Sequence, residues 1–227
     1  MKISLCILLI GLRSLYAVPI NSELQKKYFD INTSPWQYSG KFEGDMLFSN
    51  RRNGVTNLNL RWPYGRVCYY IAPSFTSAQQ NRIRDTLRNA FVGTCLQAVE
   101  NWQDCNGDYV YFKNDQGGCY SHVGRIGGGQ TLNLGGGCAD YENVILHEFM
   151  HAVGFQHEHS SPDRDNYIWI LYENIVDDQY GSFNKIQDVT PFGQPYDLCT
   201  IMHYTEYAFS KNNQPTIVAK SVSRQHS

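Results

Sequence analysis

Three histidines in one short stretch constrain this chain more than any other feature of its sequence. His147 and His151 are four residues apart, so on a helix their imidazoles share a face and can reach one point. Gly154 can adopt the positive φ that ends the helix and turns the chain back, which lets His157 bring a third nitrogen to that point. Glu148 follows the first histidine, where its carboxylate can reach a water on the metal without being a ligand. The spacing predicts a helix, a turn and a three-histidine metal site.

The chemistry of the predicted site is catalytic rather than structural. Three neutral imidazoles leave zinc one open position for water, so Zn²⁺ is the expected cofactor. Each histidine alone would more often be a surface or core residue, but the added glycine and third histidine make a chance pattern improbable. The back of the helix is apolar, which predicts that it is buried with its histidine face lining a cleft. The apolar residues are Val144, Ile145, Phe149, Ala152 and Val153.

The N-terminus has the pattern of a secretory signal peptide. Lys2 precedes an apolar stretch at residues 3–12, and Ala17 is a plausible cleavage position, although the stretch could also be an apolar core element. Loss of Cys6 with this segment would leave six cysteines, which in an oxidising compartment suit disulfides better than metal sites. We therefore expect a signal peptide over residues 1–17, a secreted, extracellular protein and no membrane span in the mature chain.

Charge and composition exclude several other classes of protein. The 19 Lys and Arg residues against 21 Asp and Glu give a net charge of −2, which provides no electrostatic footprint for nucleic acid or an anionic membrane. The 16 Tyr, 11 Phe and 4 Trp residues are too many for a disordered chain. At 227 residues we expect one domain, or one domain split into two lobes.

The segment between the signal peptide and the folded domain has the features of a pro-segment. Residues 18–52 are polar and weakly periodic, and they end in the basic pair Arg51-Arg52. This predicts an activating protease that cleaves at about Arg52, although paired basic residues also occur on ordinary surfaces. Asn32 begins an acceptor sequence for N-glycosylation, and an unmodified loop is nearly as consistent with so short a pattern.

Alternation and capping signals predict the main elements before the histidine helix. The β-branched and aromatic run at residues 67–71 predicts a strand, and Thr76 or Ser77 can cap the helix that follows. One apolar face of that helix is made by Ile83, Leu87, Ala90 and Phe91. Three short strands, separated by glycine clusters, are expected at residues 109–112, 119–124 and 131–134. No cluster continues into the Lys-Ser/Thr of a phosphate-binding loop, so nucleotide binding has no support.

The pattern HExxHxxGxxH is the zinc signature of metzincin peptidases, and the wider sequence resembles the astacin family as far as about Lys220. The strongest match is HEFMHAVGFQHEHSSPDRDNY, residues 147–167. The resemblance implies an α+β, metzincin/zincin-like two-lobed catalytic domain over residues 53–227. Its N-terminal lobe, about 53–157, would hold a twisted mixed sheet with two long helices, and its C-terminal lobe, about 158–227, would be irregular. It also implies a zinc endopeptidase that acts on protein or peptide substrates.

The resemblance assigns roles within the histidine motif. His147, His151 and His157 would be the zinc ligands. Glu148 would be the general base that takes a proton from a metal-bound water, which then hydrolyses the peptide bond.

A later segment, residues 200–204, is similar to the Met-turn of the family. Met202 would lie beneath the histidines as an apolar support. Tyr204 would be a catalytic, zinc-binding tyrosine that swings away to stabilise the transition state. Without the resemblance, Met202 would be interpreted as a core residue and Tyr204 as an ordinary amphipathic aromatic.

The resemblance extends into the pro-segment. Residues 42–46 are similar to the inhibitory motif of the family, in which the aspartate, here Asp45, occupies the open position of zinc and displaces the water. Cleavage after Arg52 would free Asn53, whose amine in astacins is buried near the glutamate that follows the third histidine, here Glu158. Taken alone, Asp45 would be a turn residue and Glu158 a solvated carboxylate.

One disulfide follows from the resemblance. Cys119–Cys138 matches a family pair around a strand and glycine loop, and substrate is expected to add to that strand in the antiparallel direction. Cys95 matches a cysteine whose family partner lies near the C-terminus. Because this chain ends without that cysteine and its helix, we expect an incomplete C-terminal lobe. Four cysteines are left, with three possible pairings: Cys68, Cys95, Cys105 and Cys199.

Departures from the family leave two interpretations of the function open. Ser161 stands where arginine is usual, so an ion pair around residues 163–165 is expected to be missing. Histidines outside the motif are expected on the surface: His122, His159 and His226. Because the proposed ligands and catalytic residues are all present, the main interpretation is a secreted, zymogen-activated zinc endopeptidase. The alternative is a catalytically inactive, truncated pseudoprotease that acts as a secreted binding protein.

Overall fold

The computed structural model describes residues 39–48, 58–187, 189 and 193–220. By its internal contacts the chain divides into two units, and the boundary between Gln156 and His157 falls inside the histidine motif. The signal peptide, the glycosylation sequence, the cleavage region at Arg52 and the new terminus Asn53 lie outside the described residues, so those predictions remain predictions.

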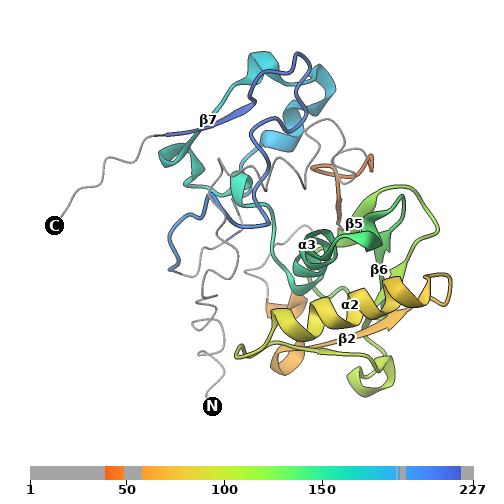
Figure 1. The fold of residues 1–227 in the computed structure, drawn as a ribbon. Helices are drawn as coiled ribbons and strands as arrows, with labels where there is room; N and C mark the ends of the chain where they lie inside the picture. The colour runs from red at the N-terminus through yellow and green to blue at the C-terminus, as the bar shows by residue number, and fades with distance from the viewer. Residues whose placement is uncertain (1–38, 49–57, 188, 190–192, 221–227) are drawn as a thin grey trace. The chain divides into compact units, whose positions relative to one another are not determined.

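The first unit is built on a mixed six-stranded sheet (Figure 1). The strands lie in the order β1 (Met46–Leu47), β5 (Cys119–His122), β6 (Gly129–Leu134), β4 (Tyr109–Lys113), β2 (Arg66–Ile71) and β3 (Gln97–Val99). β5 is antiparallel to β6, and the other neighbouring pairs are parallel. The strands expected near residues 67–71, 109–112, 119–124 and 131–134 are confirmed, as is the α+β class.

Helix α2 (Ser77–Ala90) begins at the predicted cap. The Gln79 amide donates to Thr76 Oγ1 at 3.3 Å, and the Thr76 amide donates to Gln79 Oε1 at 3.1 Å. This capping box satisfies two amides that an open helix end would leave without partners. Ile83 and Leu87 are buried in the core between helix and sheet.

Helix α3 (Glu142–Val153) carries the first part of the histidine motif, and it ends at Gly154. The glycine has φ = 126°, a conformation that other residues rarely adopt, and its amide donates to the carbonyls of Met150 and His151. The predicted helix and turn are therefore confirmed. The apolar back of α3 packs in the same core as α2, through Val144, Ile145, Phe149 and Ala152.

Replacing Phe149 by alanine should lower the free energy of unfolding by about 3–5 kcal/mol. Phe149 is fully buried, and its ring lies 6.0 Å from that of Phe112 and 5.7 Å from that of Phe91, so truncation would leave a cavity between α3 and the sheet. Denaturant unfolding measures the loss. The control, Val92→Ala, truncates a side chain that is 77% exposed and should change stability little. Equal effects of the two substitutions would contradict this core.

The second unit is mostly irregular, as expected. It contains one antiparallel pair of strands among its described residues, β7 (Ile168–Ile170) and β8 (Ile217–Ala219). Its own apolar cluster consists of Ile168, Ile175, Phe183, Tyr204, Ala208, Phe209 and Ile217. Short 3-10 turns in this unit lie at Glu158–Ser160, Arg164–Asn166, Tyr172–Asn174 and Asp177–Phe183. Those of the first unit lie at Leu58–Leu60, Pro63–Gly65, Trp102–Cys105 and Cys138–Asp140. Within the described residues, no helix is both long and apolar enough to cross a membrane.

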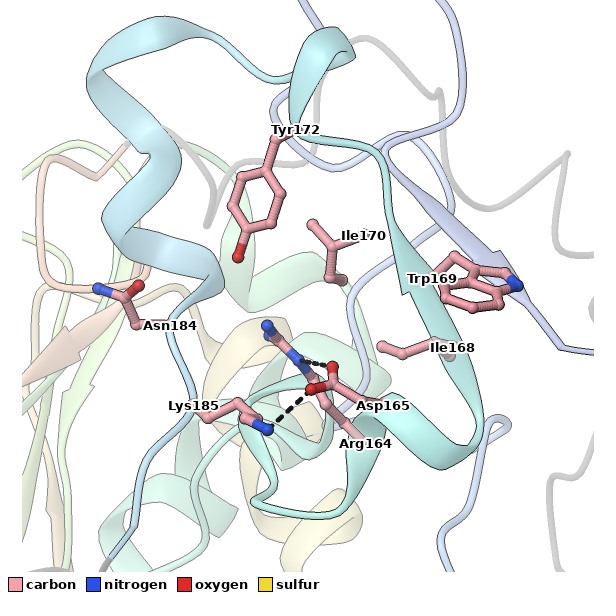
Figure 2. Close-up of a pocket in the computed structure, with 8 residues that line it drawn as sticks. All are labelled: Arg164, Asp165, Ile168, Trp169, Ile170, Tyr172, Asn184 and Lys185. Carbon is pink, nitrogen blue, oxygen red and sulfur yellow. Dashed lines mark hydrogen bonds and ion pairs between the residues drawn. The ribbon is translucent and has the colours of Figure 1, made fainter.

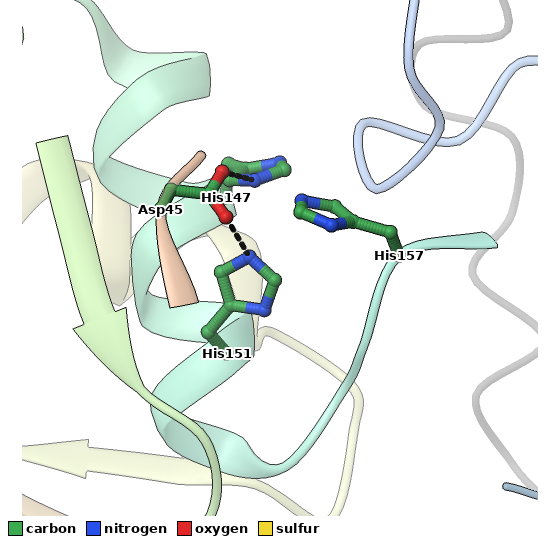
Figure 3. A group of neighbouring side chains, drawn as sticks. All are labelled: Asp45, His147, His151 and His157. Atoms are coloured by element: carbon green, nitrogen blue, oxygen red, sulfur yellow. Dashed lines mark hydrogen bonds and ion pairs between the residues drawn. The ribbon is translucent and has the colours of Figure 1, made fainter. Parts of the chain in front are cut away.

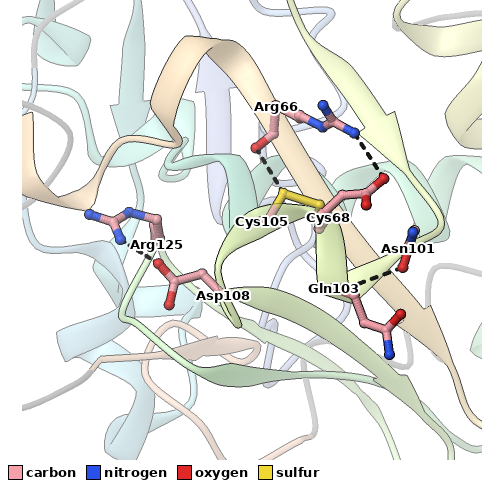
Figure 4. The surroundings of a disulfide bond; sticks show 8 residues. Arg66, Cys68, Asn101, Gln103, Cys105, Asp108 and Arg125 are labelled. Atoms are coloured by element: carbon pink, nitrogen blue, oxygen red, sulfur yellow. Dashed lines mark hydrogen bonds and ion pairs between the residues drawn. A yellow bond between two sulfur atoms is a disulfide. The ribbon is translucent and has the colours of Figure 1, made fainter.

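Two disulfides cross-link the described part of the first unit. Cys119–Cys138 joins β5 to the turn before α3, as the resemblance implied. Cys68–Cys105 joins β2 to the turn Trp102–Cys105, and Figure 4 shows it near the hydrogen bond that the Gln103 amide donates to Asn101 Oδ1 at the start of this turn. Cys199 has a free thiol, so the expectation that it is a disulfide partner is wrong. Cys199 is the only cysteine in the described part of the second unit, so the described residues of that unit offer it no partner.

The loop after the motif contains an ion pair that does not involve residue 161, so the loss expected at Ser161 stays a prediction. Arg164 is buried, and its Nε lies 3.1 Å from Asp165 Oδ1, while Lys185 Nζ lies 2.7 Å from Asp165 Oδ2. The Ser161 hydroxyl donates to Asp163 Oδ1 at 2.7 Å. The Ser161 hydroxyl thus bonds the Asp163 carboxylate, and the guanidinium of Arg164 pairs with Asp165.

Candidate metal centre

Helix α3 presents His147, Glu148 and His151 in the buried interior of the first unit. The exposed fractions of the three residues are 7%, 0% and 0%. The two imidazoles are one turn apart, with ring centroids 4.8 Å apart and planes nearly perpendicular. The predicted convergence of His147 and His151 on one region is therefore present.

Asp45 reaches the same region from the residue before the short strand β1. Its carboxylate is fully buried, with Oδ2 at 3.1 Å from His147 Nε2 and Oδ1 at 3.4 Å from His151 Nε2 (Figure 3). A tight turn at Glu43 and Gly44, both with positive φ, precedes it. The carbonyl of Asp45 accepts the Ser121 amide of β5 at 2.9 Å, which fixes this segment beside the sheet.

The tautomer of His151 follows from its second nitrogen. Nδ1 lies 2.8 Å from the carbonyl oxygen of Phe155. A carbonyl only accepts, so Nδ1 carries a proton, and in the neutral ring, which is the form that binds a metal, Nε2 has its lone pair toward Asp45. That lone pair and a carboxylate oxygen 3.4 Å away repel each other unless a proton or a metal cation lies between them. This geometry therefore fits a bound metal ion.

Two of the separations at the site are close to those between zinc ligands. Zinc binds nitrogen and oxygen tetrahedrally at about 2.0–2.2 Å, which places neighbouring ligand atoms about 3.3–3.6 Å apart. The two distances from Asp45 to the histidines, 3.1 and 3.4 Å, are close to that range. A set of imidazole nitrogens and a carboxylate oxygen suits zinc by its chemistry as well.

His157 follows the helix end by three residues. The Phe155 amide donates to the carbonyl of Met150 at 2.9 Å, which holds the start of the segment against the last turn of α3. One possible ligand atom from each of Asp45, His147, His151 and His157 lies within 4.8 Å of the others, and all four residues are buried (Figure 3).

Glu148 is the buried acid beside the first histidine. Neither carboxylate oxygen has a hydrogen-bond partner among the described residues. Burial raises the pKa of Glu148 well above its usual value, and the nearby charge of Asp45 raises it further. A carboxylate in this position has its lone pairs available for a proton.

Two residues that sequence reasoning missed fix the end of α3. The Trp62 indole donates to the carbonyl of Ala152 at 2.8 Å, and the Gly124 amide donates to the carbonyl of His151 at 2.9 Å. These carbonyls belong to the last turn, where the regular amide partner four residues on is missing. No local pattern in the sequence could reveal them, because both partners come from distant segments.

In the second unit, Met202 and Glu158 are joined through the backbone. The Glu158 amide donates to the carbonyl of Met202 at 3.0 Å, and the Met202 side chain is buried. Glu158 Oε1 accepts the Asp197 amide at 3.2 Å, and burial raises the pKa of Glu158. The supporting roles predicted for Met202 and Glu158 stay predictions.

Tyr204 is buried beside the end of the motif. Its ring centroid lies 4.7 Å from that of His157 and 3.7 Å from that of His159. His159 is fully buried, so the expectation that it lies on the surface is wrong. The rings of Tyr204 and Phe183 cover it, and the sequence separates both from His159 by more than twenty residues.

A surface hollow of about 550 Å³ in the second unit is a separate feature (Figure 2). It contains no residue of the histidine motif. Its charged residues pair with one another through the two contacts of Asp165 described above. The lining residues are Arg164, Asp165, Ile168, Trp169, Ile170, Tyr172, Asn184 and Lys185.

Comparisons with known proteins match this chain to peptidases. The family model described as Astacin, a family of peptidases, matches residues 54–227. Two nematode proteins named zinc metalloproteinase nas-8 are each 38% identical to this chain. The one from Steinernema carpocapsae is matched over 92% of this chain and 50% of its own length, and the one from Caenorhabditis elegans over 89% and 50%.

The chain is also similar to a solved structure. High choriolytic enzyme 1, a hatching enzyme zinc-protease from the medaka fish Oryzias latipes, has 34% sequence identity and a TM-score of 0.64. The match covers 74% of this chain and 81% of that one. The chain spans about half the length of the curated nematode relatives named above.

Proposed function

This chain belongs to the astacin family of peptidases, and from that premise we propose that it is a secreted zinc endopeptidase made as a zymogen. The predicted metzincin-like α+β fold is confirmed by the family match and the likeness to the hatching enzyme. The observation that carries the proposal is the buried group of Asp45 and three histidines beside Glu148.

In the proposed mechanism, His147, His151 and His157 would hold the zinc. Zinc bound there would supply a Lewis acid that polarises the peptide carbonyl and acidifies a water molecule. Glu148 takes the proton of the attacking water and delivers it to the leaving amine. The support for this role is its position, one residue from a ligand, with both oxygens buried and unbonded among the described residues. Tyr204 donates a hydrogen bond to the developing oxyanion.

Latency is assigned to the pro-segment. The support is that the Asp45 carboxylate lies 3.1 Å from His147 Nε2 and 3.4 Å from His151 Nε2, so that it would bind a metal held there and exclude the water needed for hydrolysis. β1 also covers β5, the strand along which an antiparallel substrate is expected, and it runs parallel to β5. The Ser39 hydroxyl donates to the carbonyl of Cys119, and a side chain at Gly118 would clash with Ser39. A bound pro-segment would therefore keep substrate off this edge.

Activation is proposed to occur by proteolysis at about Arg52, followed by burial of the Asn53 amine near Glu158. Burial raises the pKa of Glu158, and the charges of Asp197 and Asp163 raise it further, so a buried amine beside it would be favourable. The two disulfides support export to an oxidising compartment. Protein or peptide substrates are proposed from the family.

Metal analysis tests the proposal. Purified full-length chain loaded with zinc should hold about one zinc per chain, because the site has one set of ligands. His151→Ala should lose the metal, measured by elemental analysis after dialysis. The control is His122→Ala, which changes a half-buried histidine on β5 outside the group and should leave the zinc content unchanged.

After removal of the pro-segment, the zinc-loaded chain should hydrolyse peptides. A chelator should stop hydrolysis and added zinc should restore it. Metal-free wild-type protein would refute the site. Bound zinc without hydrolysis would instead support the secreted binding protein.

A further inference from the structure

The buried imidazole of His159 lies face to face with the ring of Tyr204. We propose that His159 is a positioning residue, which holds the Tyr204 ring in the orientation from which it acts on the oxyanion. The inference rests on the role proposed above for Tyr204. It concerns residues of the second unit only.

The stack is the closest aromatic contact of Tyr204 among the described residues. The ring centroids of His159 and Tyr204 are 3.7 Å apart and the planes differ by 22°, whereas Phe183 and Phe209 contact Tyr204 at 5.8 Å and at steeper angles. When two flat rings are stacked face to face, each ring resists tilting against the other but can slide within its own plane. His159 therefore covers one face of the Tyr204 ring, and the two phenylalanines limit its edges.

His159 is itself held rigidly. Its Nε2 lies 2.9 Å from the carbonyl oxygen of Ser182, and because a carbonyl only accepts, Nε2 carries the proton. Its backbone carbonyl accepts Arg164 Nη1 at 3.0 Å. Both the ring and the main chain of His159 are thus fixed by neighbours within the second unit.

The second ring nitrogen of His159, Nδ1, supports a positioning role for the ring. Nδ1 is buried and has no hydrogen-bond partner in the described part of the chain, which is a cost that an apolar side chain would avoid. The hydrogen bond from Nε2 to Ser182 sets the plane of the imidazole, and the flat face of the imidazole contacts Tyr204. A positioning role accounts for both features.

The main chain of Tyr204 is fixed separately. His203 Nδ1 donates to the carbonyl of Tyr204 at 2.7 Å, and the Tyr196 hydroxyl donates to His203 Nε2 at 2.7 Å. Since the backbone is held, Tyr204 can change position only by rotating its side chain. The face of His159 is the surface against which that rotation occurs.

Two variants separate the stack from the hydrogen bond. His159→Phe keeps a flat ring and loses the donor to Ser182. His159→Gln keeps a donor and loses the ring. We expect His159→Gln in the processed, zinc-loaded enzyme to lower kcat roughly 10- to 100-fold with KM little changed, because a misplaced group weakens the transition state alone. His159→Phe should stay within about threefold of wild type.

A second readout needs neither zinc nor turnover. In metal-free full-length chain with ¹³C-labelled tyrosine, the ring resonance of Tyr204 is assigned by its disappearance in Tyr204→Phe. His159→Gln should move that resonance toward the position of an unstacked tyrosine, and His159→Phe should leave a ring-current shift. If His159→Gln does not fold, as judged by thermal unfolding, His159→Leu replaces it as the variant without a flat ring.

Three outcomes decide the question. A ring-less variant with unchanged kcat and an unshifted Tyr204 resonance overturns the proposal, as does a His159→Phe variant that loses as much activity as His159→Gln. If Tyr204→Phe itself hydrolyses peptides at the wild-type rate, the proposed role of Tyr204 fails. In that case the resonance of Tyr204 still tests the stack.

Discussion

Glu148→Gln is expected to lower kcat for peptide hydrolysis by about 10²- to 10⁴-fold while the chain still binds zinc, because glutamine has nearly the same shape but cannot accept the proton of the attacking water. The residue is fully buried, and its carboxylate makes no hydrogen bond to the described residues, so the substitution removes little that holds the helix. Steady-state kinetics on the activated enzyme measure the loss, and elemental analysis shows that the metal is retained.

The matched control for this prediction is Glu142→Gln. Glu142 is an exposed residue in the first turn of the same helix, so the variant tests loss of one carboxylate from α3 away from the histidines. It should change stability by no more than about 1 kcal/mol through the helix dipole and leave hydrolysis intact. A Glu148→Gln enzyme as active as this control would remove Glu148 from the mechanism.

Asp45→Ala is expected to give the uncleaved, zinc-loaded chain at least roughly tenfold more activity on a short peptide. A tethered ligand has an effective concentration of about the millimolar range, so its removal relieves strong competition for the open metal position. Asp45→Asn should lie between wild type and Asp45→Ala, because a neutral amide oxygen is a weaker ligand than a carboxylate. Initial rates before and after processing at about Arg52 give the degree of latency.

The control for latency is Asp85→Ala, which removes an exposed carboxylate on α2 that pairs with Arg88. It should leave the uncleaved chain as inactive as wild type. If Asp45→Ala is equally inactive, coverage of β5 by Met46–Leu47 would be sufficient for latency without the carboxylate. In that event the metal-switch role of Asp45 would be wrong.

Local signals in the sequence predicted much of the first unit. The capping pair Thr76 and Gln79 and the glycine after α3 act through neighbours in the chain, so their effects can be inferred from spacing. The histidine motif is local for the same reason. Even the site aspartate, Asp45, could be singled out, but only through resemblance to a family, because it is 102 residues from His147.

Contacts between distant segments could not be predicted in this way. The indole of Trp62 caps a helix end 90 residues away, and His159 is buried by aromatic residues that no period connects to it. Asp165 pairs with Lys185 as well as with its neighbour Arg164, and the spacing of charges around Ser161 gives no sign of the lysine twenty residues away. Tertiary packing decided each of these cases.

The Cys119–Cys138 disulfide links β5, which would become an edge strand once β1 is removed, covalently to the turn before α3. A polypeptide added to that edge would take its alignment from Cys119–His122, and the covalent link would transmit this alignment to the helix that carries His147. Reduction of this single bond would uncouple the two. A thiol reductant should then first reduce the accuracy with which the scissile bond of a substrate is aligned, and only later unfold the domain.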